Sequence, residues 1–245
     1  MFSGASKTPI FGSPTPIPNR VNPQLRIDLN EKLYLRDPQA TDLGRRLIDQ
    51  SIRLIDELGF EQFTFKKLAQ RMGSTEASLY RYFENKHRLL VYLVSWYWAW
   101  LGFQIRFHTH NVPDPRARLR LTLSILTRAH HDDPTTADLD EAALYRIVVH
   151  EASKSYLTRD VDGDNQEGLF REHKRLVAGI AAVVSEIKPS YPYPHALIST
   201  VLEAARKQLF FAQHLPSLTD AGAADSVEQG IYAFLEGLVF GVLDT

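Results

Sequence analysis

The chain of 245 residues contains no cysteine. This absence excludes disulfide bonds, thiolate metal sites and a cysteine nucleophile, and it suits a reducing compartment. The first thirty residues also lack the continuous apolar core of a secretory signal. The sequence therefore predicts a cytoplasmic protein.

Catalytic and metal-binding motifs are missing as well. There is no glycine-rich phosphate loop, no nucleophile elbow and no recognised ligand spacing among the histidines. Asp160, Asp162 and Asp164 alternate like the start of a calcium loop, but Asn165 and Arg171 occupy the positions that need glycine and glutamate. We therefore expect neither an enzyme nor a protein with a metal or another cofactor.

Strand-like alternation of polar and apolar residues is also absent. The segments between the predicted loops are all of helical length, and 44% hydrophobic content is ample for a buried core. Proline, glycine and polar clusters place loops at 111–115, 130–136, 159–165 and 188–194. The sequence therefore predicts an all-α fold.

The net charge of −1 hides an uneven distribution. Residues 1–90 carry 14 Lys and Arg against 10 Asp and Glu, whereas residues 91–245 carry 14 against 19. A basic N-terminal part is typical of a nucleic-acid-binding domain, although ordinary solvated charge would also give this modest asymmetry.

Residues 63–90 predict two short helices that meet at Gly73 in helix-turn-helix fashion. Thr64 is placed to cap the first helix and Gly73 to end it. The inward-facing stripe of this helix consists of Phe65, Leu68, Ala69 and Met72.

A second short helix is predicted after Thr75, its capping residue, with Leu79 and Phe83 turned inward. A helix this short needs support from its neighbours, and insertion into a DNA major groove is one reason to expose it. A third helix begins after Asn85, with Lys86 in its first turn. The residues left for the outer faces of the second helix are Glu76, Ala77, Ser78, Arg81 and Tyr82.

This stretch resembles the N-terminal domain of TetR/AcrR-type bacterial transcriptional regulators over roughly residues 41–95. The resemblance implies a three-helix DNA-binding domain followed by a larger helical domain that binds a small molecule and forms a homodimer. It depends on Thr64, Leu68–Ala69, Gly73, Leu79–Tyr80, Tyr82–Phe83, Lys86 and Leu89.

The resemblance also implies individual roles. Double-stranded DNA is the expected partner, with phosphates held by Thr64, Tyr82 and Lys86, and with bases approached by Thr75, Ala77 and Arg81. Two positions depart from the family pattern: Ser74 replaces a branched apolar residue, and Glu76 replaces a common lysine. A carboxylate at Glu76 would repel phosphate but can accept a hydrogen bond from cytosine N4.

Three regions are predicted along the chain. Residues 1–37 contain Pro9, Pro14, Pro16, Pro18 and Pro23 and are expected to form a flexible arm, either inert or able to touch DNA. Residues 38–88 are expected to form the DNA-binding domain, and a periodic helix over 41–58 braces its two short helices. Residues 89–245 are expected to form the ligand-binding and dimerisation domain.

Residues 89–107 carry no charge before Arg106 and are apolar on nearly every side. Such a helix belongs either in a bilayer or inside a protein, so a membrane-associated protein and a helical enzyme with an aromatic cavity are the alternatives. Tryptophans in the middle of the span favour the protein interior. The predicted walls of an effector cavity are Trp96, Trp100, Phe103 and Phe107.

Two final helices are predicted over 195–213 and 226–242, with small residues between large apolar ones. The resemblance implies that these helices form a four-helix interface between two subunits. The resulting hypothesis is a homodimeric repressor in which an unidentified small molecule changes the spacing of two DNA-binding heads.

Overall fold

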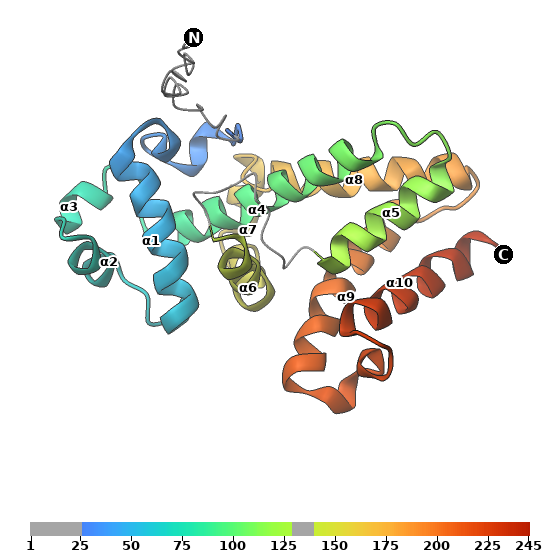
Figure 1. Cartoon of the computed structure of the whole chain (residues 1–245). Coiled ribbons are helices and arrows are strands. Elements are labelled where there is room, and N and C mark those ends of the chain that lie inside the picture. The colour runs from blue at the N-terminus through green and yellow to red at the C-terminus, as the bar shows by residue number, and fades with distance from the viewer. Residues whose placement is uncertain (1–25, 129–139) are drawn as a thin grey trace, which may run out of the picture.

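The computed structural model describes residues 26–128 and 140–245, and within these ranges it contains helices and no strand. The predicted all-α fold is therefore confirmed. Figure 1 places a small N-terminal group of helices at one end and a larger C-terminal group at the other. The α-helices are α1 (Asp42–Leu58), α2 (Phe65–Met72), α3 (Glu76–Leu79), α4 (Lys86–Thr109), α5 (Pro115–Arg128), α6 (Glu141–Glu151), α7 (Val161–Gln166), α8 (Arg171–Ile187), α9 (Pro194–His214) and α10 (Val227–Leu243).

Each helix of the N-terminal group begins at a side-chain cap. The side-chain oxygens of Thr41, Thr64, Thr75 and Asn85 accept from backbone amides in the first turns of α1, α2, α3 and α4, respectively. Gly73 ends α2 in the left-handed conformation, with φ of 61°, which glycine adopts without a steric penalty. The predicted helix-turn-helix is therefore present, with α1 packed behind α2 (Figure 1).

Helix α4 leads from the N-terminal group of helices into the centre of the molecule (Figure 1). It packs against α5, α6 and α8, and its side chains are buried on nearly every side. Within residues 26–128 and 140–245, no helix has both the length and the hydropathy needed to cross a bilayer. The apolar run over 89–107 is therefore a core helix.

The predicted flexible arm is wrong for residues 26–37. Ile27, Leu29 and Leu33 are buried in the core, and the amide of Leu35 donates to the carbonyl of Tyr82 at 2.8 Å. The apolar residues between the polar ones therefore anchor this segment. Residues 1–25, which contain the five prolines, lie outside the described residues.

The C-terminal helices agree closely with the sequence predictions. Helices α9 and α10 pack side by side (Figure 1). Helix α9 is one residue longer at each end than predicted, and α10 begins and ends one residue later than predicted. The predicted loop over 159–165 is wrong, because α7 begins at Val161 and its Asp164 is buried against His87 and Arg88. The predicted loop over 130–136 lies outside the described residues.

Candidate DNA-binding surface and effector groove

The outer face of α3 and of the turn after it is polar and aromatic. Leu79 is fully buried beneath it, whereas Thr75, Ala77, Tyr80 and Arg81 are exposed. Thr64, at the start of α2, is exposed as well. The structure thus places five potential DNA-contacting side chains on the surface of the helix-turn-helix, and four of them were predicted.

Arg81 differs from several other arginines of this domain. Arg71 pairs with Glu57, Arg53 with Asp49, and Arg45 with Asp42. Within the described part of the chain, Arg81 has no hydrogen bond or ion pair. Its guanidinium therefore remains available for a base edge or a phosphate, to which the planar fork of arginine is well suited.

Glu76 and Tyr80 form a pair on this surface. The hydroxyl of Tyr80 donates to Oε1 of Glu76 at 3.3 Å, and the Tyr80 ring packs edge-on against Phe65 at 5.0 Å. Burial and the neighbouring Glu76 carboxylate raise the pKa of Tyr80. The two side chains thus restrain each other, which orients the Glu76 carboxylate at the start of α3.

Ser74, which stands where the family has a branched apolar residue, is half-buried and shares a hydrogen bond of 2.8 Å with Ser78. This polar contact replaces apolar packing between the turn and α3.

The predicted outward orientation of Tyr82 is wrong. Only 2% of Tyr82 is exposed, and its hydroxyl shares a hydrogen bond with Oγ1 of Thr41, with 2.7 Å between the oxygens. Because Thr41 also caps α1, Tyr82 joins the turn after α3 to the start of α1. The exposed tyrosine of this turn is Tyr80, which the sequence analysis did not select.

Lys86 is also directed into the protein and not outward as predicted. Its Nζ donates to the carbonyl oxygens of Phe60, Glu61 and Phe63 at 3.2, 3.3 and 3.4 Å. The ammonium lies 4.8 Å from the centre of the Phe60 ring. Lys86 therefore holds the loop between α1 and α2, and we assign it a structural role.

The four predicted effector contacts on α4 do not have a common environment. Trp96 and Trp100 are buried in the core, whereas Phe107 is 67% exposed and stacks on the half-buried Phe103 at 6.0 Å. A helix buried along most of its length places such residues against neighbouring helices, and the stripe pattern does not reveal a cavity.

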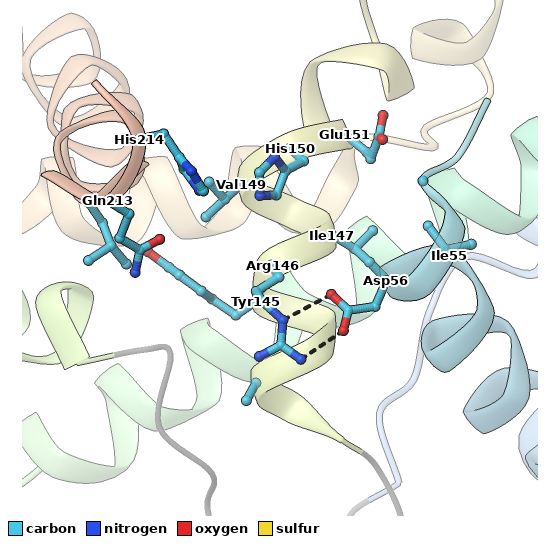
Figure 2. A pocket seen from close by; sticks show the side chains of 13 residues that line it. Ile55, Asp56, Tyr145, Arg146, Ile147, Val149, His150, Glu151, Gln213 and His214 are labelled. Carbon is cyan, nitrogen blue, oxygen red and sulfur yellow. Dashed lines mark hydrogen bonds and ion pairs between the residues drawn. The ribbon is translucent and has the colours of Figure 1, made fainter. Parts of the chain in front are cut away.

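A groove lies instead where the DNA-binding domain meets the C-terminal domain (Figure 2). Its volume is about 570 Å³, which lies within the range of small-molecule sites. The walls come from the end of α1, from α6 and from the end of α9. The lining residues are Ile55, Asp56, Gly59, Ala142, Tyr145, Arg146, Ile147, Val149, His150, Glu151, Leu209, Gln213 and His214.

Polar contacts across this junction connect α1 to α6. Arg146 on α6 makes two hydrogen bonds to the Asp56 carboxylate, at 2.9 and 2.8 Å (Figure 2). Oε1 of Glu151 accepts from the amide of Phe60 at 3.3 Å. A two-point arginine–carboxylate pair fixes orientation as well as distance, so α1 and α6 are coupled at this point.

Two imidazoles face each other in the groove. The rings of His150 and His214 lie 6.0 Å apart between centroids (Figure 2). The ring of Phe210 lies 5.3 Å from that of His150 and 4.7 Å from that of His214. Burial, together with the nearby His214, lowers the pKa of His150. His150 is therefore mainly neutral at pH 7, with one nitrogen able to donate and one able to accept.

The N-terminal helices thus form a helix-turn-helix, and a larger helical domain packs against it. Residues 47–93 match the sequence model of the family described as bacterial regulatory proteins, tetR family. Residues 47–93 therefore form a helix-turn-helix segment similar to that of this family.

Comparison with known proteins agrees with this assignment. The chain is 32% identical over 111 residues to the HTH-type transcriptional repressor KstR of Rhodococcus jostii (strain RHA1). The match covers 44% of this chain and 49% of the relative, so it spans about half the length of each.

Two solved structures have the same fold. One is FadR of Bacillus subtilis in complex with stearoyl-CoA, at a TM-score of 0.58 and 16% identity, covering 80% of this chain and 97% of that chain. The other is AibR in complex with isovaleryl coenzyme A and operator DNA, at a TM-score of 0.56 and 17% identity. This match covers 80% of this chain and 98% of that chain.

Proposed function

We propose that this protein is a sequence-specific DNA-binding repressor that acts as a homodimer and responds to a small molecule. The observation that carries the proposal is the exposed surface of α3 and of the turn after it, where Tyr80 and Arg81 are exposed next to the fully buried Leu79. The match to the tetR family model and the similarity to a transcriptional repressor support it.

On this surface we assign Thr64 and Tyr80 to phosphates, and Thr75, Glu76, Ala77 and Arg81 to bases. The hydroxyls and short side chains permit close approach, and the Glu76 carboxylate can accept from cytosine N4. Tyr80 takes the role first given to Tyr82.

Selection of preferred sites from random duplexes tests this assignment. The expected result is a palindrome with half-sites about one helical turn, roughly 34 Å, apart. Arg81→Ala should relax the preference at one base pair, equivalent to about 1–3 kcal/mol. Arg175→Gln on α8, where the side chain is 63% exposed, is the charge-matched control and should leave the selected sequence unchanged. Selection of no sequence would refute the proposed function.

The dimer is assigned to the outer face of α9 and α10. Phe234 is 48% exposed there, and Gly237 and Gly241 follow it on the same exposed face of α10. A Cβ at either glycine would meet nothing within 4 Å in the single chain, so packing within the subunit does not require glycine at these positions. Close approach of a second subunit would require it.

Sedimentation of the full chain tests this interface. Phe234→Glu should convert the dimer to monomers and abolish binding to the palindrome, because a charge would be buried between the subunits. Phe107→Glu introduces the same charge at an exposed aromatic on α4 and should leave the dimer intact. A Phe234→Glu variant that remains dimeric would place the interface elsewhere.

A small molecule can control DNA binding only if the protein has two conformational states that differ in DNA affinity. An effector lowers operator affinity only to the extent that it binds the DNA-incompetent state more tightly. The related structures contain acyl-coenzyme A molecules. At 16–17% identity these ligands do not transfer to this chain, so its effector has to be inferred from its own residues.

A further inference from the structure

We propose that the groove between α1, α6 and α9 binds an amphipathic organic acid, whose carboxylate competes with Asp56 for Arg146. This inference rests on the proposed function and deepens it by locating the effector and naming its chemical class. The groove lies at the junction of the two domains and therefore offers a direct route from ligand binding to the position of α1 (Figure 2).

The uncommitted polar groups of the groove favour an anion. Among the residues that the structure describes, the side chains of His150, His214 and Gln213 make no hydrogen bond. Each can donate an N–H to an oxygen of a ligand. The two acids of the groove already have partners: Asp56 pairs with Arg146, and Glu151 with Lys154 at 2.9 Å. The groove therefore has free N–H donors close to the Arg146 guanidinium, and both of its carboxylates are already paired.

The remaining walls favour an apolar body on the same ligand. Ile55, Ile147, Val149 and Leu209 contribute aliphatic side chains from all three helices. Burial of such surface gives affinity, while a few polar groups fix the orientation. A carboxylate attached to an alkyl chain satisfies both parts of the groove.

The same chemistry explains how binding reaches the DNA-binding domain. Asp56 and Gly59 belong to α1 and its end, whereas Arg146 belongs to α6, so the ion pair joins the two domains. When the ligand carboxylate takes the Arg146 guanidinium, Asp56 loses its partner and α1 is released from α6. Operator affinity then falls because the DNA-binding head is no longer held at one spacing.

Protonation should strengthen this binding. The charged and titratable groups around His150 are Asp56 on α1, Glu151 on α6, and Lys207 and His214 on α9. A carboxylate placed near His150 favours its protonated form, so binding takes up protons from solution. Affinity should therefore rise as the pH falls from 7 to 6, provided that the ligand stays ionised.

Calorimetric titration of the full chain without DNA tests the inference. Three probes with the same ten-carbon tail are decanoate and decyltrimethylammonium, each below its micelle concentration, and decanol below its solubility limit. Decanoate should bind with proton uptake, and the other two should bind at least about tenfold more weakly, since charged hydrogen bonds supply the difference. Equal affinity of decanol, or tighter binding of the cation, would overturn the proposal.

Two variants test the competition itself. Arg146→Gln should weaken decanoate binding about tenfold. Asp56→Asn should tighten it, because Arg146 no longer has a carboxylate partner on α1. A gain of affinity cannot arise from a folding defect. Unchanged or weaker binding to Asp56→Asn would contradict the mechanism, and Arg175→Gln should behave like the unmodified chain.

The titrations are independent of DNA binding, so the two proposals can fail separately. If the chain selects no DNA sequence but binds decanoate as described, the groove assignment stands and the repressor proposal falls. If a palindrome is selected but decanoate does not bind, the effector inference is wrong and the DNA-binding function remains.

Discussion

Replacement of Tyr82 by phenylalanine separates a structural from a DNA-contacting role for this residue. The change removes the hydroxyl that shares a hydrogen bond of 2.7 Å with Thr41, and it leaves the buried ring in place. Thr41 Oγ1 still accepts from the amide of Gly44 at 3.0 Å, so the cap of α1 survives. We expect a loss of about 1 kcal/mol in the free energy of unfolding, the usual net value of one hydrogen bond.

Urea denaturation measures this loss, and for a chain of this length it corresponds to a fall of about 2–4 °C in Tm. Thr41→Val should cost more, about 1–2 kcal/mol, because it removes both the cap and the bond to Tyr82. The double variant should be less destabilised than the sum of the two, with a coupling of about 1 kcal/mol.

DNA titrations over a range of salt concentrations complete the test. Tyr82→Phe should leave the salt dependence of operator binding unchanged, since a buried hydroxyl cannot reach a phosphate. Tyr80→Phe is the matched comparison, because Tyr80 is exposed and its hydroxyl bonds, among the described residues, to Glu76 alone. It should weaken DNA binding with little change in stability. The opposite pattern, full stability with weaker DNA binding in Tyr82→Phe, would refute the assignment.

The other predictions concern the half-buried Lys86 and the pH dependence of stability. Lys86→Met should lower stability by about 1–3 kcal/mol through loss of its bonds to three carbonyls, measured by urea denaturation, while the salt dependence of DNA binding stays the same. Burial lowers the pKa of His173 to about 4, so below pH 6.5 the unfolded chain binds more protons than the folded chain. Stability should therefore fall by about 2 kcal/mol between pH 7 and pH 5, and a His173→Phe variant should lack that part of the decline.

Local signals were sufficient to predict the helices of the DNA-binding domain. Caps such as Thr64 and Thr75 and the left-handed Gly73 are fixed by side chains within a few residues, so the sequence contains the information directly. The same holds for Asp114, whose carboxylate accepts from the amides of Arg116 and Ala117 at the start of α5.

The orientation of the side chains that follow α3 could not be predicted from such local signals. The helix ends at Leu79 after four residues, and Tyr80, Arg81 and Tyr82 lie in turns. A helical period extended beyond Leu79 gives the wrong face for Tyr82. Its inward position depends on residues distant in sequence, among them Thr41, 41 residues away. Choosing between Tyr80 and Tyr82 therefore required the tertiary structure.

The groove was even harder to predict from the sequence, because its polar groups come from helices far apart in sequence. Asp56, Arg146 and His214 each look like an ordinary charged or polar residue of an amphipathic helix, and nothing near them in sequence marks a site. Packing of α6 against both α1 and α9 brings them to one cavity. A site formed only by tertiary packing can also be altered by moving one helix, and for that reason displacement of Asp56 from Arg146 can control the DNA-binding domain.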